Sequence, residues 1–207
     1  MGDYKIFRDI TLDLRRHLFQ GLGGVEGIDL TNIAEISLDS PVKLSDGNGS
    51  AGEHSQAKIS LYLYQTLPNA HINNRQLIPS NNGEQHYPPL SLNLFYLLTP
   101  LDSSPETCLL ILGRAMQILA AHPIIRNHFL DSELRPDPPE VRLTLNPLNL
   151  EEMTRIWNAF NQPYRLSVCY QVQVISIDSV RLPVEEQPVK ERLLDVHQIV
   201  ASNGGVL

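Results

Sequence analysis

The stretch PYRLSVCYQVQVISIDS, residues 163–179, carries the longest regular pattern in the chain. Apolar residues alternate there with polar or weakly polar ones: Val168, Tyr170, Val172 and Val174 against Ser167, Cys169, Gln171 and Gln173. A period of two predicts a long β-strand with one apolar and one polar face. The polar face is almost uncharged, whereas a face turned to bulk water usually carries Lys, Glu or Arg. We therefore expect this face to meet another protein, or to lie under a helix or loop of the same subunit.

The composition bounds the class of protein. The chain has 207 residues, of which 42% are hydrophobic and 19% charged, as in a globular domain. Its formal net charge of −7 argues against binding to duplex nucleic acid, whose affinity rests on Lys and Arg contacts to phosphates. The same charge argues against binding to an anionic membrane surface. We expect no nucleic-acid partner.

The N-terminal stretch and the cysteines indicate where the protein is made. The first residues, MGDYKIFRDITLDLRRHL, carry charges every few positions and lack the apolar core of a secretory signal. No apolar run approaches the roughly 20 residues that cross a bilayer. Cys108 and Cys169 lie far apart in apolar patterns, which favours two buried free thiols over a disulfide. We expect synthesis in the cytoplasm.

An amphipathic helix is predicted at the start of the chain. Asp3 is its expected N-cap, and the glycine-rich residues 21–24 are its expected stop. A phosphate-binding loop is a poor alternative, because such a loop precedes a helix rather than following one. The apolar face of this helix consists of Tyr4, Phe7, Ile10, Leu14 and Leu18.

Two more helices carry clear start signals. Ser104 and Pro105 are the expected N-cap and first residue of a helix that Pro123 ends, with a second short helix over residues 123–130. Asn149 and Glu152 have capping-box spacing, and they predict a helix that runs to residue 160. Its inward-facing residues are Trp157 and Phe160.

Four further strands complete the expected fold, at residues 33–38, 57–67, 89–100 and 140–148. Polar or proline-rich connections fall at residues 45–55, 68–89 and 131–139. We predict an α+β (mixed) fold, in which a single domain over residues 1–180 packs a β-sheet with three to four helices. Residues 181–207 are expected to form a C-terminal extension.

A search for catalytic chemistry finds no site. The seven histidines form no metal signature, and no Gly-x-Ser-x-Gly elbow occurs. Cys169 lies in mid-strand among apolar neighbours, which is a poor environment for a reactive thiolate. Acidic residues near position 135 lie in a proline-rich linker that would not hold a catalytic pair. We expect no catalytic residue, no metal and no cofactor.

One polar cluster follows the second strand, and it consists of Asn69, Asn73, Asn74 and Arg75. It lacks a nucleophile or base, so we interpret it as loop scaffolding or a subunit contact, with ligand binding as the weaker reading. The surrounding loop, residues 68–88, also holds His71 and His86. Two alternatives remain open: a small-molecule enzyme that uses this loop, or a regulatory module whose C-terminal tail docks a partner.

Five segments in order resemble a known family. They are ISLYLYQTLPNAHINNRQ, PPLSLNLFYLLTP, LLILGRAMQILAAHPII, LNLEEMTRIWNAF and NQPYRLSVCYQVQVISIDS, and together they cover roughly residues 6–179. In this order they resemble the N-terminal domain of cap, or tail-terminator, proteins of extracellular contractile injection systems. These are the antifeeding-prophage and Photorhabdus virulence cassette type, similar to phage tail terminators. Asn74 and Arg75 match the family pattern only approximately.

The resemblance implies a structural protein rather than an enzyme. It implies a homo-hexamer that binds the inner tube protein and the sheath protein, without a small-molecule substrate. The particle would be phage tail-like, free or membrane-anchored. The residues that we expect at the subunit or partner interface are Asn69, Asn73, Asn74, Arg75, Arg165, Gln171 and Gln173.

Overall fold

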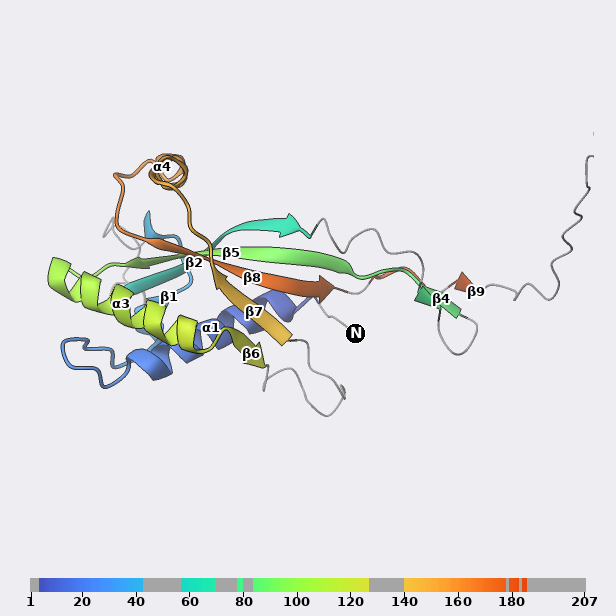
Figure 1. Ribbon diagram of the computed structural model, residues 1–207, viewed down its shortest axis with the longest axis horizontal. Helices are drawn as coiled ribbons and strands as arrows, with labels where there is room; N and C mark the ends of the chain where they lie inside the picture. The colour runs from blue at the N-terminus through green and yellow to red at the C-terminus, as the bar shows by residue number, and fades with distance from the viewer. Residues whose placement is uncertain are drawn as a thin grey trace, which may run out of the picture.

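Figure 1 shows the computed structural model of the chain, whose long strands follow the longest axis of the molecule. The structure describes residues 4–42, 57–69, 78–79, 84–126, 140–177, 179–182 and 184–185. A six-stranded sheet in the order β1-β2-β5-β8-β7-β6 forms the body. Its strands are β1 (Ile36–Ser37), β2 (Ile59–Pro68), β5 (Leu90–Pro100), β6 (Ile124–Arg126), β7 (Glu140–Leu145) and β8 (Val168–Ile177).

The three long strands β2, β5 and β8 form the centre of the sheet. β5 pairs antiparallel with both neighbours, so that Tyr96 lies opposite Leu63 on β2 and Tyr170 on β8. Tyr96 and Leu97 point to opposite faces of the sheet and are both fully buried. Strand β5 is therefore buried on both faces at this point.

Two helices cover one face of the sheet. They are α1 (Ile6–Leu22) and α3 (Pro105–Ala121), and the chain between them supplies β2 and β5. The Thr11 hydroxyl on α1 lies 2.8 Å from the Tyr96 hydroxyl on β5, which fixes the helix on the sheet. Burial raises the pKa of Tyr96 to about 12. The main core lies in this layer and includes Ile6, Ile10, Leu14, Leu18, Leu94, Leu98, Ile111, Ala115, Leu143 and Val172.

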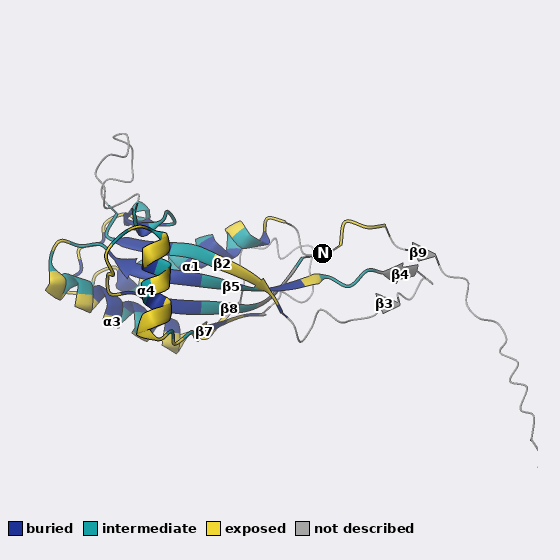
Figure 2. Cartoon of the chain, turned by 90° about the horizontal axis from the view of Figure 1, so that it is seen from above, coloured by how far each residue is buried: buried dark blue, intermediate teal, exposed yellow. Residues whose placement is uncertain are grey.

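The third helix, α4 (Leu150–Ala159), lies on the opposite face and at one end of the sheet (Figure 2). Its capping box is formed as predicted: the Glu152 N–H donates to the Asn149 Oδ1 at 2.8 Å, and the Asn149 N–H donates to Glu152 at 2.9 Å. Trp157 and Met153 pack from this helix onto Leu97 and Cys169 as a second, smaller core. In the described part of the chain, no helix is both long and apolar enough to span a membrane.

The start of the first helix differs from the prediction. Lys5 occupies the N-cap position without a capping side chain, Tyr4 is 76% exposed rather than part of the apolar face, and Asp3 lies outside the described residues. The helix ends at Leu22 with Gly23 as its C-cap. Gly21 has a different use, because a Cβ there would lie 2.6 Å from the Cδ1 atom of Ile118. The glycine thus allows α1 and α3 to pack closely.

Two other predicted elements need correction. The helix expected over residues 123–130 is wrong, because residues 124–126 form strand β6 on the edge of β7. Pro123 ends α3, and the branched Ile124 and Ile125 that follow favour an extended chain. The strand expected over residues 33–38 is shortened to β1, because a 3-10 helix occupies Ile33–Glu35. The connections at residues 45–55 and 131–139 lie outside the described residues.

A second, three-stranded sheet stands away from the body at one end of the long axis (Figure 1). We call it the arm, and it consists of β3 (Ile78–Pro79), β4 (Glu84–His86) and β9 (Val184–Glu185) in the order β3-β4-β9. The arm was missed in the sequence because its strands are two or three residues long, and β9 lies more than ninety residues after its partner β4.

The packing of α1 on α3 predicts sensitivity to acid. The rings of His17 on α1 and His122, the C-cap of α3, lie 4.7 Å apart at 82°. Burial, and then the proximity of His122, lowers the pKa of His17. Because the pKa of His17 is lower in the folded chain, the unfolded chain binds the proton more readily. His17 therefore does not reduce stability above its unfolded pKa near 6.5, and it destabilises the fold as the pH falls below that value.

We therefore expect the urea midpoint to drop more steeply between pH 7.5 and pH 5 in the wild type than in His17→Gln. His122→Gln removes the smaller of the two causes, so its pH dependence should be intermediate. Parallel midpoint curves for the wild type and His17→Gln would contradict this account.

The attachment of α4 predicts a large effect of Trp157→Ala. Trp157 is 1% exposed, and its removal should cost about 3–5 kcal/mol in the free energy of unfolding. Cys169 beneath it should then react with a thiol reagent, which burial prevents in the wild type. Arg155→Ala on the same helix is the matched control. Its exposed ion pair with Glu151 contributes about 0.5 kcal/mol or less, so Cys169 should stay protected.

Candidate functional site

The described residues offer little for catalysis. They contain no group of three or more metal-ligating side chains. Both cysteines are free thiols, as predicted; Cys169 is buried as expected, whereas Cys108 is only half-buried. Burial raises the pKa of Cys169 to about 11 and that of Cys108 above its usual range, so neither is a ready thiolate. His71 lies outside the described residues, as does the side chain of His86.

The feature that stands out is a sheet face that α4 covers at one end only. Beyond α4, the same face of β2, β5 and β8 continues without a described element over it (Figure 2). Strand register places its residues together, since partners in an antiparallel pair share a face. Phe95 lies opposite Gln65 and Gln171, and Gln173 lies opposite Arg142. We call the set the open sheet face: Gln65, Leu67, Asn93, Phe95, Arg142, Thr144, Gln171 and Gln173.

The side chains of the open sheet face are polar and apolar, and most of them are uncharged. Arg142 is its one charged member; the others are amides, a hydroxyl and two apolar side chains. Leu67 is 42% exposed, whereas Phe95, Gln171 and Gln173 are half-buried by their strand neighbours. Amide side chains offer both donors and acceptors without the cost of removing a charge from water. The face therefore suits contact with another protein surface.

The polar face of β8 and of the residue before it has a buried part and an open part. Ser167 and Cys169, at the α4 end, are buried within the subunit. The Ser167 hydroxyl lies 3.0 Å from the Thr99 hydroxyl and donates to the Arg165 carbonyl at 2.9 Å. Gln171 and Gln173 lie beyond the helix, on the open sheet face. We expected the polar face of this strand either to lie under a helix of the same subunit or to contact another protein. The first expectation is confirmed at the start of the strand, where α4 covers Cys169. Contact with another protein stays a prediction for Gln171 and Gln173.

Of the polar cluster after β2, the structure describes one residue, Asn69. Asn69 is buried: its N–H donates to the Ser91 carbonyl at 2.8 Å, and its Nδ2 donates to the Asn93 Oδ1 at 3.3 Å. Asn69 thus joins the end of β2 to β5, which is a scaffolding role. Asn73, Asn74 and Arg75 lie outside the described residues.

Arg165 lies in another place from the glutamines. It is exposed in the corner between α4 and β8, and it lines a groove of about 370 Å³ with Leu166 and the start of α3. The sequence analysis grouped Arg165 and the two glutamines at one expected interface and did not assign them to separate surfaces. The structure does not bring these predicted residues together.

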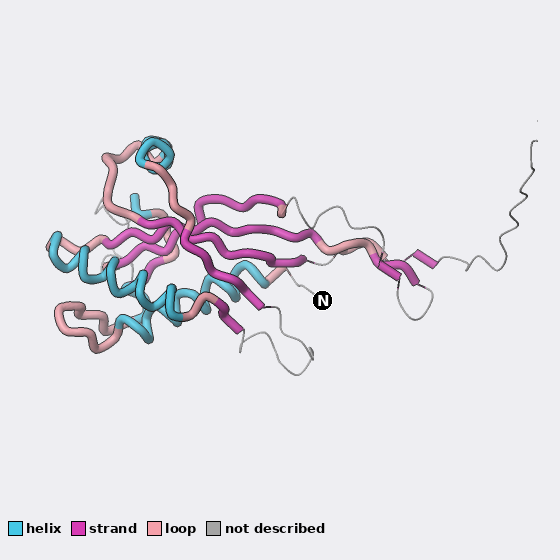
Figure 3. The backbone as a smooth tube through the Cα atoms, viewed as in Figure 1, coloured by secondary structure: helices cyan, strands magenta, loops and turns pink. Residues whose placement is uncertain are grey.

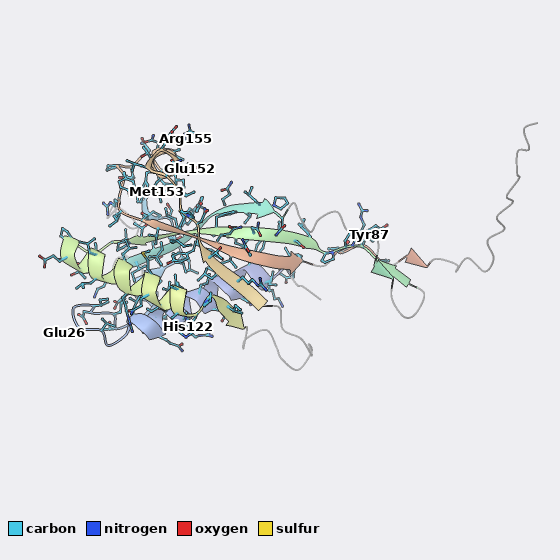
Figure 4. The ribbon with its side chains drawn as sticks, in the orientation of Figure 1. Glu26, Tyr87, His122, Glu152, Met153 and Arg155 are labelled. Carbon is cyan, nitrogen blue, oxygen red and sulfur yellow. The ribbon has the colours of Figure 1, made fainter. Side chains whose placement is uncertain are left out.

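A cation–aromatic contact lies at the base of the arm. The Arg181 guanidinium, in the segment between β8 and β9, lies 5.0 Å from the centre of the Tyr87 ring, in the segment between β4 and β5. Figure 4 labels Tyr87 at this position. A cation over an aromatic face at this distance is attracted to it. Figure 3 shows that the two connecting segments run side by side from the sheet to the arm.

Two solved structures have the same fold as this chain. One is the PVC sheath/tube terminator of an extracellular contractile injection system in its extended state, with a TM-score of 0.61 and 18% identity, covering 98% of this chain and 66% of that one. The other is the tube-terminating cap of the anti-feeding prophage, with a TM-score of 0.55 and 17% identity, covering 90% of this chain and 60% of that one. The predicted mixed α+β, terminator-like fold is confirmed.

The sequence itself settles the family. No curated protein matches it. The family model described as the Pvc16 N-terminal domain matches residues 9–191, which is most of the chain. The solved terminators extend beyond the matched part, since this chain spans 66% or less of their length. The resemblance found in the five sequence segments is confirmed, and the chain belongs to the Pvc16 N-terminal domain family.

Proposed function

We propose that this chain is a structural assembly protein that caps the distal end of a contractile injection system. In this role it forms a homo-hexameric ring that ends the inner tube and joins it to the last sheath ring. It acts without catalysis or cofactor, and after synthesis in the cytoplasm it becomes part of a phage tail-like particle. The observation that carries the proposal is the open sheet face of a chain that belongs to this family.

The two ends of the molecule suit a closed ring. The open sheet face lies on the body, and the arm stands away from the body at one end of the long axis (Figure 1). A ring arises when one surface of each copy meets a different surface of the next, with a rotation that closes. Residues 1–180 would form the body of each subunit, and residues 181–207 an extension that reaches a neighbour.

The open sheet face gives the most direct test. Gln171→Glu adds a negative charge to a face on which Arg142 is the one charged member, and burying this added charge in the contact should weaken assembly. In a particle preparation, this variant should give uncapped tubes of irregular length. Gln117→Glu is the matched control, because Gln117 is exposed on α3 and bonds Arg114 at 2.7 Å, an interaction that a carboxylate keeps. Its particles should match the wild type in length.

Light scattering tests the ring itself. The account expects a mass of six times 23.3 kDa, either for the protein alone or for the protein bound to tube. A stable monomer that joins neither tube nor sheath would overturn the proposal.

The base of the arm gives a second test. Tyr87→Ala removes the ring beneath Arg181 and should reduce capping, whereas Tyr87→Phe keeps the aromatic face and should retain it. The midpoint of thermal unfolding should be similar in both variants, because the arm lies outside the main core. Equal capping by the two variants would show that this contact is not needed.

A further inference from the structure

A groove opens at the end of the body where α3 begins. We call it the α3 groove; it has a volume of about 370 Å³ and is lined by Asp102, Pro105, Cys108, Leu109, Arg165 and Leu166, among others. Its floor comes from the first turns of α3, and one wall comes from the corner between α4 and β8. The floor thus belongs to a helix, and the wall to the connection between α4 and β8.

The surface of the α3 groove is apolar and exposed. Leu109 is 60% exposed and Leu166 is 46% exposed, although both are large aliphatic side chains. Apolar groups that gather on a concave surface with a polar rim are typical of a protein contact. The charged lining residues are one anion, Asp102, and one cation, Arg165. A fitting partner is therefore an apolar segment without net charge.

The chain itself contains such a segment after the arm. Residues 189–200, VKERLLDVHQIV, lie outside the described residues and carry two basic and two acidic side chains. Val189, Leu193, Val196 and Val200 are spaced by four, three and four positions, which is the spacing of one helix face. The sequence therefore predicts an amphipathic helix with a narrow apolar stripe and no net charge.

The place where this segment leaves the fold decides which groove it can reach. Val184 in β9 pairs with Gln85 in β4. From Gln85 the chain runs along the long axis through β5 to Pro100, which lines the groove (Figure 1). Fifteen residues of near-extended chain span about 50 Å. If residues 189–200 adopt the helix that their spacing predicts, that helix and five extended residues before it would reach about 35 Å from Val184. Such a helix would fall short of the α3 groove of its own chain.

We propose that the α3 groove of each copy binds residues 189–200 of a neighbouring copy. The inference rests on the proposed ring and names one of its contacts: each subunit gives its segment to one neighbour and receives the segment of the other. Apolar burial drives the contact, so it should persist at high salt, where surface ion pairs are screened.

Cys108 in the α3 groove allows a direct test with full-length chains. Copies that carry Leu193→Cys and Cys108→Ala are mixed with tagged copies that keep Cys108, and the mixture is oxidised with copper phenanthroline. We expect a mixed disulfide between the two kinds of copy on a non-reducing gel. Cys169 does not compete, because it is 2% exposed.

Two controls make the result specific. Gln198→Cys places the thiol on the opposite side of the predicted helix, and it should give about tenfold less mixed disulfide than Leu193→Cys. Leu109→Asp in the Cys108 copies should reduce the yield by a similar factor of about ten, since apolar anchors dominate such contacts. Thermal unfolding should be nearly unchanged in Leu109→Asp, because the side chain is exposed.

The outcomes separate this inference from the proposed ring. A mixed disulfide with both controls supports the inference. A hexamer that caps tubes but gives no mixed disulfide, or equal yields from Leu193→Cys and Gln198→Cys, would overturn the inference and leave the ring standing. A disulfide formed within single chains carrying Leu193→Cys and Cys108 would show that the segment folds back, which also overturns it. A protein that neither assembles nor caps would overturn the ring as well.

Discussion

The antiparallel pairing of β2, β5 and β8 is the constraint on which the rest of the structure depends. A sheet of three long strands has two faces, and an apolar face must be buried. Helices α1 and α3 bury most of one face, and Tyr96 contacts this layer through its hydroxyl, which lies 2.8 Å from that of Thr11. The ten-residue helix α4 is too short to cover the other face, so it buries the Leu97 and Cys169 end and leaves the remainder open.

This unequal cover links the fold to assembly. A fully covered sheet would complete a monomer, whereas a half-covered one presents amide and apolar side chains to a neighbour. Except for Arg142, the residues on the open sheet face are uncharged, so most of the face can be buried without removing a charge from water. The arm and the start of α3, which lines the α3 groove, lie at opposite ends of the long axis (Figure 1), so in our account neighbouring copies rather than one chain bring the groove and the C-terminal segment together.

Strong local patterns predicted much of this fold. The alternation in β8, the Asn149–Glu152 capping box and the Ser104–Pro105 start were readable because neighbouring residues alone determine them. The family was also readable, from segments whose order is distinctive. The arm and β6 were not, because strands of two or three residues depend on distant partners. Nor could the sequence separate Arg165 from Gln171, since the placement of α4 between their surfaces is a tertiary feature.

The central claim is that a neighbouring subunit covers the open sheet face. The most direct measurement is the rate of thiol labelling at Gln173→Cys, made in a Cys108→Ala background, in the free protein and in assembled particles. The account predicts ready labelling of the free protein and protection by at least about tenfold after assembly, as for a group that enters the core of an interface. Equal rates in capped particles and in the free protein would contradict it.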